Sequence, residues 1–219
     1  MFARLFLSCI ALALALLGVP AWAQAAKGPH TGSELRGALG EARADSTQLE
    51  LALKLGGKTA LFCANCHGAN GNSVTPDTPN LAGQNPAYLL EQIAQFSSGQ
   101  RKHEFMQGLM RALSVNEKVG VAVYYERQSV LSQGRVSAAQ ASQGKAYYEK
   151  ACASCHGADG LGSELLSRLA GQQKSYMVTT LKRYRDGSAA RLDPTMAAFS
   201  RQMSNADIDA VADYLSTLR

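Results

Sequence analysis

The sequence lacks the features that mark several large classes of protein. Charged residues make up only 18% of its 219 residues, and although the net charge is +5, the lysines and arginines are scattered and form no dense basic run. A nucleic-acid-binding surface is therefore not expected. No segment shows the strict alternation of a half-buried strand. After the N-terminal segment, no apolar run is long enough to span a bilayer. These absences favour a helical, globular protein.

Cysteine is also scarce, and most of it lies in two places. One of the five cysteines, Cys9, belongs to the N-terminal apolar segment, and the others form two Cys-x-x-Cys pairs, Cys63 with Cys66 and Cys152 with Cys155. Four cysteines in an oxidising compartment can form two disulfides, and such pairs also bind zinc. Neither alternative explains the histidine that directly follows each pair, and the pairs lie farther apart than those of a usual zinc ribbon.

Residues 1–23 have the pattern of a secretory signal peptide. A short basic start is followed by an apolar core over Leu5 to Leu17 and by a small-x-small cleavage site that ends at Ala23. The alternative is an uncleaved anchor, but the apolar core is shorter than a spanning helix requires. We expect cleavage after Ala23 and export to the periplasm. Residues 24–48 are polar and rich in glycine, and we expect them to form a mobile leader or a loose extra segment.

The rest of the chain contains an internal repeat. The nine residues from Cys63 to Gly71 return almost unchanged from Cys152 to Gly160, and "LAGQ" occurs at 81–84 and again at 169–172. Further matched pairs are Tyr88 with Tyr176, Phe96 with Tyr184, Met106 with Met196, Ser114 with Ser204, and Tyr124 with Tyr214. Because the offset stays between 88 and 90 residues, the pattern indicates a duplicated domain. We expect a first domain at 49–127, a linker at 128–137 and a second domain at 138–219.

Each copy reads as all-α. The segments before the cysteine pairs have helical composition, and a second helix is expected to begin at Asn85, as its cap, and Pro86, and to end at Gly99. The last helix of the first copy opens with Ser114 and Glu117, which fit a capping box. The second copy repeats this pattern with Ser204 and Asp207.

The pattern Cys-x-x-Cys-His is the attachment signature of c-type haem. Two thiols at this spacing form thioethers with the two vinyl groups on one edge of the porphyrin, and the adjacent imidazole then reaches the iron. We predict two covalently bound haem groups. Their attachment residues are Cys63 and Cys66, then Cys152 and Cys155, and their iron ligands are His67 and His156.

The second axial ligand of each iron is expected to be a methionine. Met106 and Met196 lie at nearly the same distance after their histidines, and each precedes its capping serine by eight residues. Met110 and His103 are alternatives in the first copy. No methionine stands at the position aligned with Met110, Met177 or Met203, so these are expected to pack in the core.

A His–Met pair fills the coordination of the iron and raises its reduction potential, which favours electron transfer over catalysis. Each ligating histidine is expected to donate its other N–H to a carbonyl, that of Pro79 in the first copy and of Ser167 in the second. Because the second copy lacks the proline, we expect unequal potentials for the two haems.

These motifs together resemble the cytochrome c4 family, the di-haem members of the class I cytochromes c, over about residues 50–218. The resemblance implies two tandem cytochrome c folds and a role as a periplasmic electron carrier. The implied partners are a membrane quinol-oxidising complex or a dehydrogenase as donor, and a terminal oxidase or reductase as acceptor. Peripheral association with a membrane stays open. The alternatives are a haem subunit of a dehydrogenase or sulfur-oxidising complex, and a di-haem peroxidase.

Overall fold

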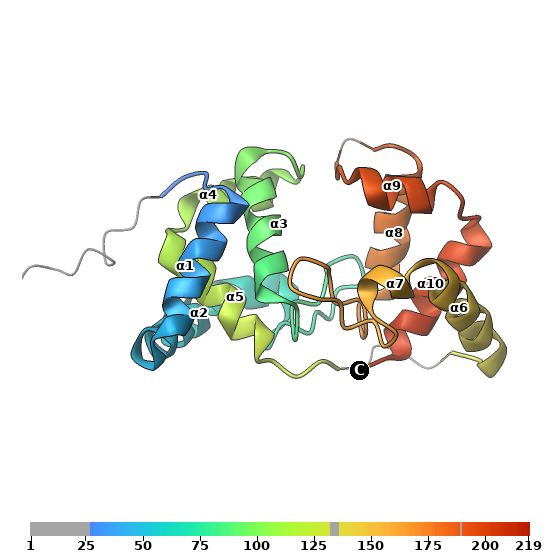
Figure 1. Ribbon diagram of the computed structural model, residues 1–219, viewed down its shortest axis with the longest axis horizontal. Helices are drawn as coiled ribbons and strands as arrows, with labels where there is room; N and C mark the ends of the chain where they lie inside the picture. The colour runs from blue at the N-terminus through green and yellow to red at the C-terminus, as the bar shows by residue number, and fades with distance from the viewer. Residues whose placement is uncertain (1–26, 132–135, 189) are drawn as a thin grey trace, which may run out of the picture.

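The structure is a computed structural model that describes residues 27–131, 136–188 and 190–219. The expected signal peptide at 1–23 and the middle of the expected linker lie outside the described residues. Within the described ranges the chain forms helices and no strand, apart from one isolated antiparallel bridge between Lys27 and Ser114. The helices gather in two lobes joined by loops (Figure 1). The all-α prediction is therefore confirmed.

The helices of the two lobes follow one another in chain order. The first lobe contains α1 (Gly32–Ala44), α2 (Ser46–His67), α3 (Pro86–Ser98), α4 (Glu104–Ala112) and α5 (Val115–Glu126). The second contains α6 (Ala138–Ala151), α7 (Ala153–His156), α8 (Lys174–Arg185), α9 (Pro194–Ser200) and α10 (Asn205–Thr217). No described helix is both long enough and apolar enough to cross a membrane.

Each lobe is built on a pair of crossing helices, one of which carries the cysteine motif. In the first lobe α2 packs along α5, and in the second α6 packs along α10. The crossings are close: a Cβ added to Gly56 would stand 2.0 Å from the Gly120 carbonyl oxygen, and one added to Gly144 would stand 2.0 Å from that of Ala210. The two crossings recur at the offset of the sequence repeat.

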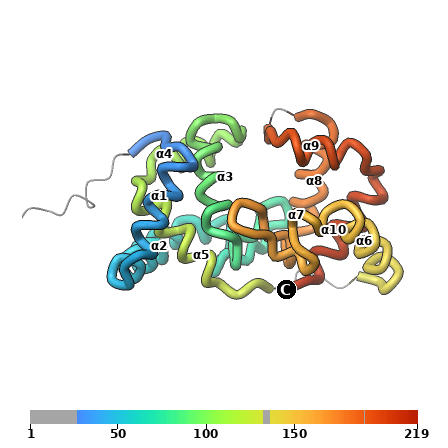
Figure 2. The backbone as a smooth tube through the Cα atoms, viewed as in Figure 1, coloured from blue at the N-terminus to red at the C-terminus, as the bar shows by residue number. Residues whose placement is uncertain are grey.

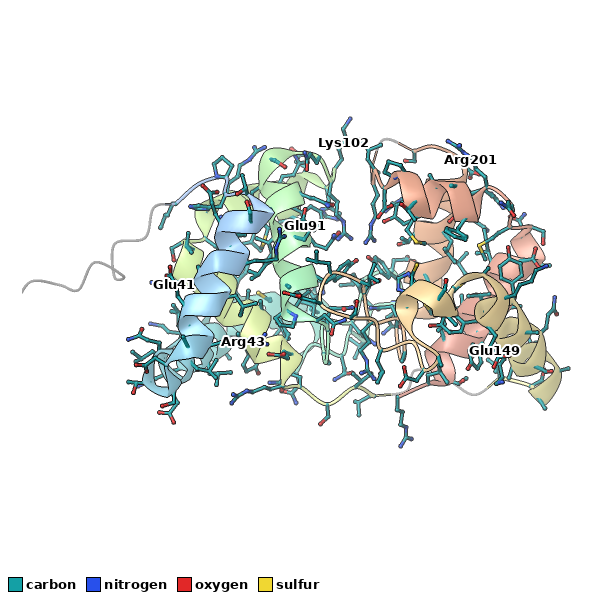
Figure 3. The ribbon with its side chains drawn as sticks, in the orientation of Figure 1. Glu41, Arg43, Glu91, Lys102, Glu149 and Arg201 are labelled. Carbon is teal, nitrogen blue, oxygen red and sulfur yellow. The ribbon has the colours of Figure 1, made fainter. Side chains whose placement is uncertain are left out.

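The expectation of a mobile leader is wrong for residues 32–44. They form α1, which begins with a capping box between Thr31 and Glu34 and buries Leu35 and Leu39 in the core of the first lobe. An ion pair of 2.8 Å joins Arg36 to Glu91, which is labelled on α3 in Figure 3. The helix forms because its cap satisfies the first backbone N–H groups and its apolar side chains find a partner surface.

The structure confirms two of the predicted helix caps and differs at a third. The capping boxes at Ser114 and at Ser204 are both present. Asn85 does occupy the residue before α3, but its side chain makes no capping bond. Its amide instead donates to the carbonyls of Leu161 and Leu166 in the other lobe, at 3.1 and 2.8 Å.

Candidate functional site

The two cysteine motifs lie at the same place in the two lobes, where a helix ends. In the first lobe α2 carries Cys63 and Cys66, ends at His67, and is followed by Gly68 at φ +78°. A side chain on Gly68 would meet the Asn72 carbonyl at 2.1 Å, so only glycine allows the sharp turn that directs the chain back beside the histidine.

The cysteines are available for covalent attachment. All four in the described chain are free thiols, with Cys66 and Cys155 exposed and Cys63 and Cys152 half-buried. Burial raises the pKa of Cys152 to about 11, so this thiol is protonated at neutral pH. Among the described residues no group of three His, Cys, Asp or Glu side chains lies close enough to hold a metal ion.

Both histidines are held in the same way. The Nδ1 atom of His67 lies 2.9 Å from the Pro79 carbonyl oxygen, and that of His156 lies 3.0 Å from the Ser167 carbonyl oxygen. These are the carbonyls expected from the sequence. Because each carbonyl accepts a hydrogen bond, the ring proton stays on Nδ1 and the lone pair of Nε2 is left free. Burial lowers the pKa of both rings, which favours the neutral imidazole that iron requires.

The two aligned methionines also share one local structure. Met106 is the third residue of α4 and Met196 the third of α9. In each case the residue before the helix caps the methionine N–H, through His103 Nδ1 at 3.4 Å and Asp193 Oδ1 at 2.9 Å. His103 therefore caps α4 as Asp193 caps α9. The sequence repeat did not indicate this shared capping role, because the two residues are of different types.

The remaining methionines of the described residues are core residues. Met110 is buried in the core of the first lobe, and Met177 and Met203 are buried in that of the second. Met106 and Met196 are less buried than these three. The burial agrees with the expected packing role of the unmatched methionines.

A cluster of arginines and tyrosines joins the two lobes. Arg191 donates to the Tyr176 hydroxyl at 2.8 Å within its own lobe, and to the Tyr88 hydroxyl at 2.5 Å in the other. Arg101 also donates to Tyr176, at 3.0 Å. Burial alone would raise the pKa of Tyr176, but Arg191 and Arg101 outweigh it and lower that pKa to about 7.

The cluster has the character of an anion site. Among the described residues neither Arg101 nor Arg191 forms an ion pair with a carboxylate. Partly buried cations are unfavourable without counter-charges, and a Tyr176 hydroxyl with a pKa of about 7 supplies only part of one at neutral pH. Each arginine also precedes its aligned methionine by five residues. A haem carries two carboxylates, and Arg101, Arg191 and the tyrosine hydroxyls form a donor set that fits them. The sequence signal that was missed is the recurrence of these arginines at the repeat offset.

Comparisons with known proteins agree with this geometry. Family models described as "Cytochrome c" and as "Cytochrome C oxidase, cbb3-type, subunit III" match residues 55–117 and 139–215. Cytochrome c4 from Pseudomonas aeruginosa is 33% identical over 171 residues, which cover 73% of this chain and 85% of that protein. The crystal structure of reduced recombinant cytochrome c4 from Pseudomonas stutzeri superposes with a TM-score of 0.69 at 31% identity, covering 76% of this chain and 98% of the other.

A relative with a more specific name also matches. The thiosulfate dehydrogenase electron acceptor of Stutzerimonas stutzeri is 31% identical over 173 residues, covering 73% of this chain and 80% of its own.

Two helical lobes, each with a Cys-x-x-Cys-His motif at a helix end, define a c-type cytochrome with two covalently bound haems. At this level of identity and coverage, the chain belongs to the cytochrome c4 family. It is a di-haem electron carrier.

Proposed function

We propose that both irons are six-coordinate, with His67 and Met106 as axial ligands in the first lobe and His156 and Met196 in the second. The supporting observation is the twin placement of the methionines: each is the third residue of a short helix and has its backbone N–H capped by the residue before that helix. A methionine that only fills the core does not need the same helix position and the same cap in both lobes. An iron ligand does, because its sulfur must be held at a fixed point.

The chain's own residues then prepare electron transfer. The haem iron supplies the one-electron chemistry when the cofactor is bound. Cys63 and Cys66, like Cys152 and Cys155, fix its edge, and the carbonyls of Pro79 and Ser167 fix the two imidazole planes. Two filled axial positions leave no site for oxygen or peroxide, so the carrier function is favoured over a peroxidase.

We infer a periplasmic location and an exchange of electrons with respiratory partners. Donors of the proposed class are a quinol-oxidising complex or a dehydrogenase, and the acceptor is a terminal oxidase. The relative named as a thiosulfate dehydrogenase electron acceptor supports a dehydrogenase as one donor. Removal of residues 1–23 takes away Arg4 from the 22 basic side chains and leaves 21 of them against 17 acidic ones, and this basic surplus favours acidic docking surfaces on these partners. Stopped-flow mixing with purified thiosulfate dehydrogenase, and with oxidase-containing membranes, measures both reactions.

The axial ligands are tested by matched methionine variants. Oxidised His–Met haem shows a long-wavelength charge-transfer band that requires the iron–sulfur bond. We expect Met106→Leu and Met196→Leu each to remove about half of this band. Met110→Leu and Met203→Leu, which change core methionines of the same lobes, should keep it. Loss of the band in Met110→Leu but not in Met106→Leu would assign the first ligand to Met110 instead.

A further inference from the structure

The two "LAGQ" segments form reciprocal bridges between the lobes. Gln172 of the second lobe accepts from the backbone N–H of Asn80 at 2.7 Å and donates to the Asn80 carbonyl at 3.0 Å. Gln84 of the first lobe accepts from the backbone N–H of Arg168 at 2.7 Å and donates to the Arg168 carbonyl at 2.9 Å. Both glutamines are buried. The loops that carry them meet between the lobes (Figure 2).

Each N–H that a glutamine binds belongs to the peptide unit whose carbonyl accepts from a histidine Nδ1. The Asn80 N–H shares its peptide plane with the Pro79 carbonyl, which accepts from His67 Nδ1. Likewise, the Arg168 N–H shares its plane with the Ser167 carbonyl, which accepts from His156 Nδ1. A peptide unit is rigid and planar, so a bond to its N–H fixes the direction of its C=O. The same bond polarises the unit, which makes the carbonyl a stronger acceptor.

From this geometry we propose that each glutamine is a positioning residue for the histidine of the opposite lobe. Gln172 sets the Nδ1 hydrogen bond of His67, and Gln84 sets that of His156. The inference rests on the proposed function, because it takes both histidines as iron ligands. A stronger Nδ1 bond makes the imidazole a more basic ligand, which stabilises the oxidised iron and lowers its reduction potential.

A short path of hydrogen bonds joins the glutamine of one lobe to the histidine of the other. From Gln172 Oε1 to the ring of His67 there are two hydrogen bonds and one peptide unit. In addition, the Asn80 side chain donates to the Gly171 carbonyl at 2.7 Å, and the first peptide unit is thereby held twice. In the described part of the chain, the Arg168 side chain instead donates to the Ala170 carbonyl of its own lobe, at 3.3 Å. The "LAGQ" repeat thus has a role in the function as well as in domain packing.

The test is a crossed measurement of potentials in the holoprotein. We expect Gln172→Met, which keeps the length of the side chain and removes its hydrogen bonds, to raise the potential of the first haem. The second haem should stay at its wild-type potential. Gln84→Met should do the reverse, and it repeats the test if the Gln172 variant fails to fold. Paramagnetically shifted haem methyl resonances, assigned by contacts within each lobe, report the two haems separately during redox titration.

Asn85→Ala is the matched control. It removes hydrogen bonds across the same boundary, to the carbonyls of Leu161 and Leu166, but neither of these accepts from a histidine. We expect it to leave both potentials unchanged. The proposal is overturned if the glutamine variants leave the potentials unchanged, shift the haem of their own lobe, or act no differently from Asn85→Ala. Failure of the axial assignment itself would appear instead as carbon monoxide binding to the wild-type protein.

Discussion

The carbonyl oxygen of Gly120 lies 2.0 Å from the point where a β-carbon on Gly56 would stand, so α2 and α5 cross in backbone contact. An alanine at Gly56 would force these helices apart. We expect Gly56→Ala to lower the free energy of unfolding by about 1–3 kcal/mol or more, the usual cost of overpacking. Urea unfolding of the holoprotein measures this.

Gly57→Ala is the neighbouring control for that crossing. A β-carbon on Gly57 would meet the Tyr124 ring at 3.5 Å, an ordinary contact. The helix propensity of alanine should then leave the protein unchanged or stabilise it by up to about 1 kcal/mol. Equal losses in the two variants would contradict the proposed close crossing.

The N-terminal helix is expected to contribute to the stability of the first lobe. Leu35 is completely buried, and truncation of a buried leucine costs about 2–5 kcal/mol. Leu35→Ala should therefore lower the midpoint of thermal unfolding clearly more than Leu51→Ala, which truncates a leucine that is 40% exposed. Equal midpoints would mean that α1 is not part of the cooperative unit.

The buried Lys118 makes stability depend on pH. Its ammonium donates to the Gly28 carbonyl at 2.7 Å and lies 3.0 Å from His30 Nδ1. Burial lowers the pKa of Lys118 from 10.5 to about 8. Between these values the unfolded chain binds more protons, so the free energy of unfolding should rise with pH through this window. Lys118→Met, measured by urea unfolding across pH 7 to 11, should lose this rise; the same slope in both proteins would contradict the assignment.

The arginine cluster is expected to influence the reduction potentials. A cation beside the haem stabilises the reduced form, so Arg191→Gln should lower the potential of at least one haem. Arg201→Gln removes an exposed charge from the outer end of α9 (Figure 3) and should change the potentials less. A variant with lower stability but unchanged potentials would assign the cluster to domain packing alone.

Local signals predicted much of the fold. The capping boxes at Ser114 and Ser204 act within one helical turn, and so the sequence is sufficient to find them. The Thr31–Glu34 box of α1 carries the same signal, but the glycine-rich composition of the leader obscured it. Asn85 shows the opposite case: its amide bonds to residues more than seventy positions away. No local pattern indicates that such a partner is present.

The parts of the site that lie within one loop were also predictable from the sequence, whereas the contacts between the lobes were not. Cysteine and histidine spacing identifies haem attachment, and the repeat offset identifies the carbonyls of Pro79 and Ser167, because both follow from chemistry within one loop. The bridging role of Gln84 and Gln172 was not predictable. It depends on the docking of two lobes, and a repeated glutamine alone does not reveal which backbone it will contact.

The central claim is that both irons are six-coordinate electron carriers. The most direct test is the absorption spectrum of the reduced holoprotein before and after addition of carbon monoxide. Filled His–Met coordination predicts an unchanged spectrum. A clear shift in about half of the haem would mean that one iron is open or its methionine labile, and would contradict the account of a pure carrier.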